Sequence, residues 1–210
     1  MPLVLLIRHG ENEYVKSGKL AGHTPGVHLN ERGRQQAGAL AEALAGVRLK
    51  AIYASPLERA VETAEPIARK HGLEIQLRPD LKDNAIGRWQ GRSWKALRRT
   101  RAWKVVQQAP SRFRFPEGES FMETQARVVA CLEAIVAAHK PKDVLAVVFH
   151  ADPIKLAVAY YLGMPLDHFQ RLGCDTGSIT WMYLGPQSAA LLRLNQTAHL
   201  ETMEQKRHDK

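Results

Sequence analysis

Two short apolar runs, each ending in a histidine, constrain the fold of this chain more than any other feature. The first spans residues 3–7 and leads into Arg8 and His9, and the second spans residues 144–149 and leads into His150. Runs of this length without polar alternation are typical of strands buried on both faces, as in a parallel sheet. Ligands of open α/β sheets bind beyond the carboxyl ends of the strands. Both histidines are therefore predicted to lie where such a fold builds its binding site.

The rest of the chain predicts helices that alternate with further strands. Helices are expected over 30–45, 55–70 and 93–108, from 121 onward and from 152 onward, and strands over 51–54, 74–77, 178–184 and 189–195, the last two joined by a turn at 185–186. Asn30, Ser55 and Asp152 are predicted to cap their helices, and Ser120 with Glu123 has the spacing of a capping box. This alternation indicates an α/β fold.

We therefore expect a single-domain three-layer sandwich over residues 1–196, with a mostly parallel sheet and helices on both faces. Residues 78–140 are expected to include a helical insertion over the C-terminal edge of the sheet, and 197–210 to form a loose tail. The length of 210 residues, 45% of them hydrophobic, suits one core. No apolar run approaches the length of a membrane span, so a membrane partner is not expected. Two widely separated cysteines, Cys131 and Cys174, favour a reduced, cytoplasmic protein.

The net charge of +9 is compatible with a nucleic-acid binder and with an enzyme for phosphorylated substrates. Part of the excess lies in one segment with these cations: Arg88, Arg92, Lys95, Arg98, Arg99, Arg101, Lys104, Arg112 and Arg114. A solvated helix face is the simpler explanation for such a run. Because no RNA-binding signature or zinc finger is recognisable, nucleic acid is not the expected partner.

Arg59 extends the candidate site beyond the two histidines. It falls in the first turn of the helix that follows the strand 51–54, and helix N-termini favour anions through free N–H groups and the helix dipole. If that strand lies beside the first, Arg59 joins Arg8, His9 and His150 around one pocket. Two guanidinium groups and two imidazoles suit a phosphoryl group, because guanidinium binds its oxygens in pairs.

Five segments in order resemble the histidine phosphatase (phosphoglycerate mutase-like) superfamily. They are residues 5–11, 55–64, 81–91, 115–120 and the segment around His150. Details over 22–29, 103–107 and 168–171 are similar to a bacterial subgroup described as phosphomutases. Any one motif alone is weak, but five in family order are specific.

The resemblance implies that His9 is the nucleophile and that His150 is a second histidine of the phosphate pocket. It also implies that Arg8 and Arg59 bind the phosphate, that Asn12 contributes to the same site, and that no metal or organic cofactor is required. A neutral imidazole can attack phosphorus if an acceptor holds its other N–H, and the two arginines should keep it neutral by lowering its pKa. The alternative is a pair of buried structural histidines.

The sequence departs from the family pattern at the proton donor and near the phosphate. Asp83 stands where glutamate is usual, Asn12 where serine or threonine is common, and Val15 where asparagine is frequent. Asp83 is the predicted proton donor, with a solvated loop acid as the alternative. Asp152 is the competing donor, although its position before Pro153 also suits a helix cap.

The function expected from the resemblance is hydrolysis of a small phosphate monoester through a phosphohistidine. A phosphomutase shares the first half-reaction and is the closest rival. A phospholigand-binding protein without turnover, or a basic nucleic-acid-binding protein, are rivals of another class. The partner is a small phosphorylated substrate; the oligomeric state stays open, with a homodimer as one option.

Overall fold

The computed structural model describes residues 1–185 and 188–201. Within them, six strands form one sheet in the order β3-β2-β4-β1-β5-β6. The strands are β1 (Leu3–Arg8), β2 (Leu49–Ala54), β3 (Ile75–Leu77), β4 (Val144–Phe149), β5 (Ile179–Leu184) and β6 (Ala189–Gln196). Strands β1 to β4 pair in parallel, whereas β5 pairs antiparallel with β1 and β6. The predicted turn that joins β5 to β6 includes residue 186, which lies outside the described residues.

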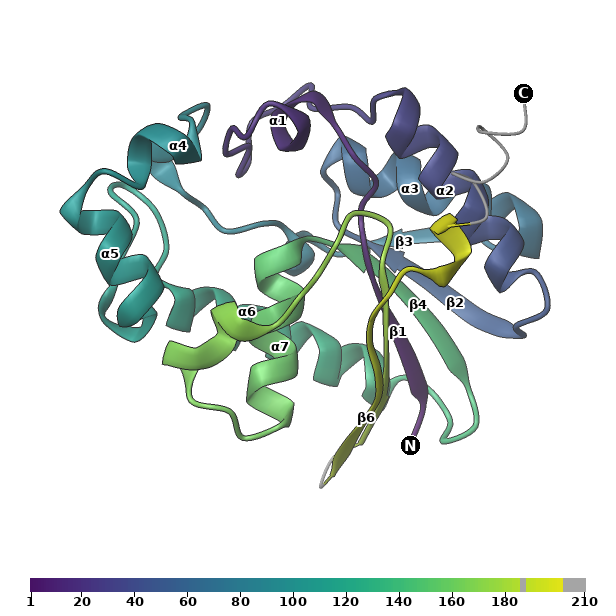
Figure 1. Cartoon of the computed structure of the whole chain (residues 1–210). Helices are drawn as coiled ribbons and strands as arrows, with labels where there is room; N and C mark the ends of the chain where they lie inside the picture. The colour runs from purple at the N-terminus through teal and green to yellow at the C-terminus, as the bar shows by residue number, and fades with distance from the viewer. Residues whose placement is uncertain (186–187, 202–210) are drawn as a thin grey trace.

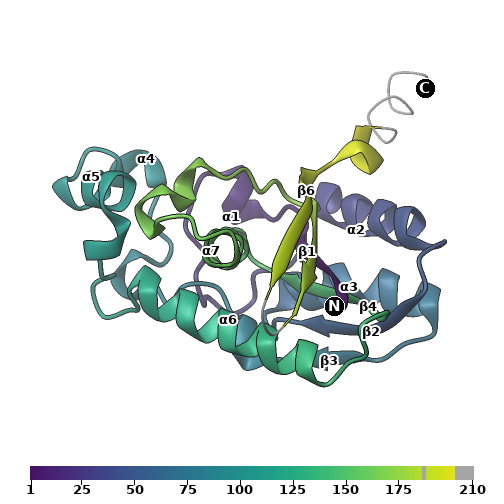
Figure 2. The same ribbon diagram turned by 90° about the horizontal axis from the view of Figure 1, so that it is seen from below.

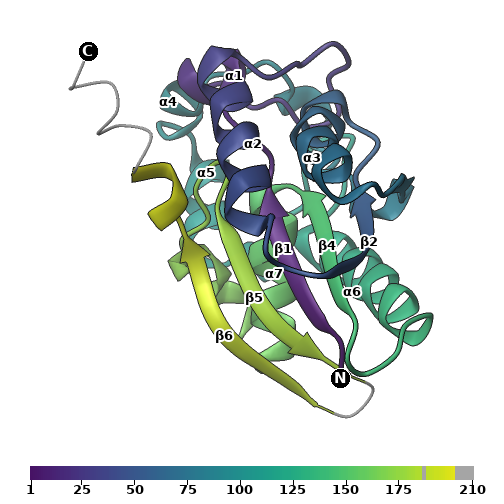
Figure 3. The same ribbon diagram turned by 90° about the vertical axis from the view of Figure 1, so that its right-hand side faces the viewer.

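Helices cover both faces of this sheet, which confirms the predicted α/β sandwich. The helices are α1 (Glu13–Lys16), α2 (Glu31–Leu44), α3 (Glu58–His71), α4 (Trp94–Leu97), α5 (Arg101–Gln108), α6 (Phe121–Ala137) and α7 (Ala151–Tyr161). Alternate residues of β1 face opposite layers: Leu5 packs with α2 and α3, and Leu6 packs with α6 and α7. Figures 2 and 3 show the sheet between these two pairs of helices. Two apolar cores result, one on each face.

Short helices α4 and α5 form a cap that stands apart from the two helix layers (Figure 1). Their apolar side chains join a third core together with residues such as Ile86, Trp89 and Phe121. Helix α6, which the sequence analysis grouped with the insertion, packs against the sheet instead, because Val128 and Leu132 are buried in the core of that face. We refer to residues 93–108 as the cap.

The structure confirms some of the helix caps predicted from the sequence and contradicts others. Asn30 caps α2 by accepting from the Gly33 amide, and Ser120 and Glu123 form the predicted capping box of α6. Ser55 does not cap α3, which begins at Glu58 after Leu57. The predicted loose tail falls mostly outside the described residues: 198–201 form a helical turn, and 202–210 are not described.

Candidate active site

His9 follows the carboxyl end of β1 and is 4% exposed. Its Nδ1 lies 2.7 Å from the carbonyl oxygen of Gly10. Since a carbonyl only accepts hydrogen bonds, Nδ1 carries the proton and Nε2 keeps its lone pair. Burial lowers the pKa of His9 well below its usual value, and the charges of Arg59 and Arg8 lower it further. The imidazole is therefore a neutral base with one nitrogen available for attack.

The loop that carries His9 is held by contacts from two helices. The amide of Gly10 donates to Oγ1 of Thr63 on α3 at 2.9 Å. A Cβ on Gly10 would lie 2.6 Å from the carbonyl oxygen of Gly33 on α2. Helix α2 therefore approaches the loop so closely that neither glycine leaves room for a side chain.

Arg8 and Arg59 reach this point from different elements. Arg59 is the second residue of α3 and is fully buried; its Nη2 donates to the carbonyl of Gly22 at 2.8 Å and to Asp83 at 3.2 Å. Arg8 donates through Nη1 to the carbonyl of Cys174 at 2.6 Å. Strand β2 does not adjoin β1, because β4 lies between them. The carboxyl ends of all three strands nevertheless meet at one edge.

His150 lies beneath His9, at the carboxyl end of β4. It is fully buried, and the two ring centroids are 5.2 Å apart. Its Nε2 is 2.9 Å from the Ser55 hydroxyl, so Ser55 is a partner of His150 rather than the predicted helix cap. Burial, followed by the charge of Arg59, lowers the pKa of His150 well below its usual value. Two neutral imidazoles therefore lie side by side.

Asp83 approaches Arg59 and His150 from the loop between β3 and α4. One carboxylate oxygen lies 3.2 Å from Arg59 and 3.8 Å from Nδ1 of His150, and the side chain is 23% exposed. Burial raises the pKa of Asp83, while Arg59 opposes that rise. Burial thus favours the protonated form, the form that a general acid needs.

Asp152 is not the cap that was predicted for α7. His150 occupies the capping position, and Asp152 is the second residue inside the helix. Its carboxylate accepts from Lys155 at 3.0 Å and from the amide of Asn84 at 3.3 Å. The contact with Lys155, one helical turn away, and the contact with Asn84, on a loop, orient the Asp152 carboxylate. Asp152 faces the same cavity as Asp83.

The side-chain oxygen of Asn12 has a structural role. Its Oδ1 accepts from the amide of Val15 at 2.9 Å and so caps α1. Its Nδ2 has no hydrogen-bond partner among the described residues, although it is buried. Val15, where the family often has asparagine, lines the cavity with an apolar side chain.

Five buried nitrogen atoms in this region have no hydrogen-bond partner among the described residues. They are Arg8 Nε, Asn12 Nδ2, Arg59 Nε, Arg59 Nη1 and His150 Nδ1. Buried donors normally have an acceptor, because an unmade hydrogen bond costs about 1–3 kcal/mol. The cluster is therefore built for an acceptor-rich ligand.

Glu119 and Arg127 position the loop that carries Asp83, a role that sequence reasoning missed. Arg127 pairs with both carboxylate oxygens of Glu119, at 3.0 and 2.9 Å. Its guanidinium also donates to the main-chain carbonyls of Asp80, Lys82 and Asp83 at 2.6 to 3.3 Å. Glu119 lies in the segment 115–120 that resembles a family motif, but the motif by itself does not indicate this contact. Its partner on α6 is not recognisable from spacing.

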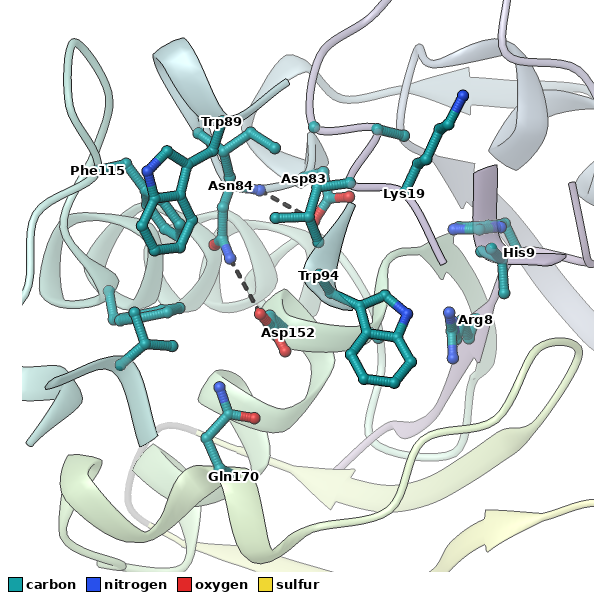
Figure 4. Close-up of a pocket in the computed structure, with 18 of the residues that line it drawn as sticks. Arg8, His9, Lys19, Asp83, Asn84, Trp89, Trp94, Phe115, Asp152 and Gln170 are labelled. Atoms are coloured by element: carbon teal, nitrogen blue, oxygen red, sulfur yellow. Dashed lines mark hydrogen bonds between the residues drawn. The ribbon is translucent and has the colours of Figure 1, made fainter. Parts of the chain in front are cut away.

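A cavity of about 330 Å³ opens above these groups and runs under the cap. Figure 4 shows Trp89 and Phe115 at one end and Arg8 and His9 at the other. Trp94 and Trp103 of the cap also line it. His9, Arg8, Arg59, Asn12 and Asp83 all face this cavity, and His150 is fully buried beside His9.

Within the described ranges, no cluster of three or more histidine, cysteine or acidic side chains could hold a metal ion. None of the helices in the same ranges is both long and apolar enough to cross a membrane.

The sequence profile described as histidine phosphatase superfamily (branch 1) matches residues 4–197. Phosphoserine phosphatase 1 of Hydrogenobacter thermophilus is 31% identical over 205 residues, which cover 95% of each chain. A 2,3-bisphosphoglycerate-dependent phosphoglycerate mutase of Thermoplasma acidophilum is 31% identical over 180 residues, 86% of each chain. The crystal structure of phosphoserine phosphatase from Entamoeba histolytica with 3-phosphoglyceric acid matches with a TM-score of 0.86 and 27% identity, over 95% of this chain and 100% of that one. The chain belongs to the histidine phosphatase superfamily, branch 1.

Proposed function

We propose that this protein is a phosphatase that hydrolyses a small phosphate monoester through a phosphohistidine on His9. The observation that carries the proposal is the cluster of buried donors without partners beside a neutral imidazole. A phosphoryl group supplies three oxygens to such donors, and Arg8 and Arg59 neutralise its charge. Two relatives, each 31% identical to this chain, are named a phosphatase and a mutase. Together they support phosphoryl transfer in general.

In the first step, the lone pair on Nε2 of His9 attacks phosphorus, and the bond to the leaving oxygen breaks. The carbonyl of Gly10 holds Nδ1–H and stabilises the positive charge that develops on the ring. Asp83 gives its proton to the departing alkoxide. His150 donates from Nδ1 to the transferring phosphoryl group when the Ser55 hydroxyl donates to its Nε2.

In the second step, water attacks the phosphohistidine and the P–N bond breaks. The carboxylate of Asp83 accepts a proton from that water, so the acid is regenerated and His9 is free again. A mutase replaces the water by a second hydroxyl. The predicted cytoplasmic compartment stays a prediction.

The test is to trap phosphate on His9. A brief reaction with ³²P-labelled phosphate monoester is expected to leave an acid-labile label on the wild-type protein and none on the His9→Ala variant. His28→Ala is the matched control, because His28 is an exposed imidazole that pairs with Glu62. The His28 variant should keep the label and release inorganic phosphate at the wild-type rate.

Other outcomes separate the rivals. Normal turnover by the His9→Ala variant would refute the mechanism. Label on His9 that passes to a second phosphoglycerate hydroxyl instead of to water would make the protein a mutase. Tight phosphate binding without label would indicate a phospholigand-binding protein, and oligonucleotide affinity that falls steeply with salt would indicate a nucleic-acid binder.

A further inference from the structure

The cavity extends well beyond the phosphate-binding end, and its far part is apolar. We call this part the aromatic chamber and define it by Leu20, Ile86, Trp89, Trp94, Trp103 and Phe115. It lies where the alcohol part of a bound monoester must lie, because the phosphate occupies the end with Arg8 and His9 (Figure 4). Apolar walls with a few polar groups are typical of pockets that bind an apolar ligand body.

Contacts among three of the rings hold part of the chamber wall in place. Trp89 stacks on Trp103 with centroids 6.2 Å apart and meets Phe115 edge-on at 5.4 Å. Trp94 rests against Gly18, where a Cβ would come within 2.3 Å of the indole nitrogen. The Trp94 residue is 40% exposed. Rings that already pack on one another in this way bind a ligand without a large ordering cost.

The charged groups around the chamber disfavour a carboxylate on the substrate. Of the cations among the described lining residues, Arg8 and Arg59 are committed to the phosphate, which leaves Lys19. In Figure 4 the ammonium of Lys19 points away from Trp89 and Phe115. Asp152 presents a carboxylate to the cavity, and the buried Oδ1 of Asn84 has no partner among the described residues. Acceptors repel a carboxylate and accept from a hydroxyl or an N–H.

We infer that the substrate is the phosphate monoester of a bulky apolar or aromatic alcohol that carries no carboxylate. This inference rests on the proposed phosphatase function of the same site. It separates this chain from the relative that was crystallised with 3-phosphoglyceric acid, a small ligand with a carboxylate. The chemistry at phosphorus is unchanged; the aromatic chamber decides which alcohol leaves.

The test is a series of alkyl phosphates whose leaving alkoxides have similar basicity: ethyl, 2-phenylethyl and 2-(1-naphthyl)ethyl phosphate. The value of kcat/KM is expected to rise about 10-fold or more from ethyl to 2-phenylethyl phosphate, as occupancy of an apolar pocket permits. 3-Phosphoglycerate and phosphoserine should be poorer substrates than 2-phenylethyl phosphate.

Substitutions in the aromatic chamber test whether it causes the preference for 2-phenylethyl over ethyl phosphate. Trp94→Ala and Trp103→Ala should lower the 2-phenylethyl to ethyl ratio of kcat/KM several-fold. Trp181→Ala is the matched control and should keep the wild-type ratio, because Trp181 lies on β5 against Arg193 and not in the cavity. Trp94→Phe should restore most of the ratio.

Turnover of p-nitrophenyl phosphate separates failure of this inference from failure of the proposed function. Turnover that depends on His9, combined with a flat response to ring size or a preference for 3-phosphoglycerate, would overturn the substrate class alone. Loss of all His9-dependent turnover across every ester would overturn the phosphatase proposal and this inference with it.

Discussion

His9 and Asp83 have opposite pKa shifts for one physical reason. Burial disfavours the charged form of each group, so the pKa of the imidazole falls and the pKa of the carboxyl rises. Burial thus shifts the base toward its neutral form and the acid toward its protonated form, which are the forms that phosphoryl transfer to histidine needs. The charge of Arg59 lowers the pKa of His9 further and opposes the rise in the pKa of Asp83.

Replacement of Asp83 tests its assignment as the proton donor. Asp83→Asn is expected to slow hydrolysis of alkyl phosphates by about 10²–10⁴-fold, the usual worth of general acid assistance. It should slow p-nitrophenyl phosphate far less, because that leaving group needs almost no proton. The wild-type kcat/KM for an alkyl phosphate should also decline as pH rises through the raised pKa of Asp83, and the Asn variant should lose that decline.

The comparison with Asp152 provides the control for this assignment. Asp152 lies in the first turn of α7 and pairs with Lys155. Asp152→Asn should therefore cost about 0.3–1 kcal/mol of unfolding free energy, as loss of a favourable charge near a helix N-terminus does. If the leaving-group dependence instead follows Asp152, the proton donor is assigned wrongly, although the nucleophile is unaffected.

Helix α2 helps to determine where the His9 loop lies, because their backbones are in close contact at Gly33. A Cβ on Gly33 would lie 2.0 Å from the carbonyl oxygen of Glu11, two residues after His9. No side-chain rearrangement relieves a clash with the main chain. The helix and the loop can therefore pack this closely only where Gly33 carries no side chain.

Two glycines in the same helix make a matched pair. Gly33→Ala is expected to destabilise the fold by about 1–3 kcal/mol or more, because the helix must move away from the loop. Gly38→Ala should stabilise it by about 0.5–1 kcal/mol, since a Cβ there meets nothing within 4 Å. Urea denaturation of both variants measures the difference. Equal effects at the two positions would contradict the close approach, and only Gly33→Ala should reduce phosphatase turnover.

The whole molecule should be sensitive to acid because it buries neutral imidazoles. The pKa of His150 is lowered in the folded state from an ordinary value of 6.5. The unfolded chain therefore binds a proton more readily, so this contribution to stability is complete above pH 6.5 and is lost as pH falls toward the lowered pKa. His9 adds a loss of the same sign, whereas the raised pKa of Asp83 acts in the opposite direction.

The unfolding free energy should thus fall on acidification below about pH 6.5, by up to about 1.4 kcal/mol per pH unit for each such histidine. Between pH 5 and 6.5, the unfolding free energy of His150→Gln should depend less steeply on pH than that of the wild type, because unfolding takes up about one proton fewer. Denaturant titrations at a series of pH values measure this. An unchanged slope in the variant would show that His150 titrates normally in the fold.

Much of the framework could be predicted from the sequence because it depends on neighbours along the chain. Uninterrupted apolar runs predict the central strands, and the capping box of Ser120 and Glu123 needs only residues three apart. Arg8, His9, Arg59 and His150 could be placed at one edge because each lies at or shortly after the carboxyl end of a parallel strand. The motif order indicated the superfamily, which the comparisons confirm.

What the tertiary structure decided is which partner each polar group finds. Ser55 and Asp152 both have the local pattern of helix caps, yet Ser55 meets His150 and Asp152 meets Lys155 and Asn84. Local pattern could not predict the contacts with His150 and Asn84, because these partners lie 95 and 68 residues away in the sequence, whereas Lys155 is three residues from Asp152. The direction of each pKa shift likewise depends on burial, which only the packed fold determines.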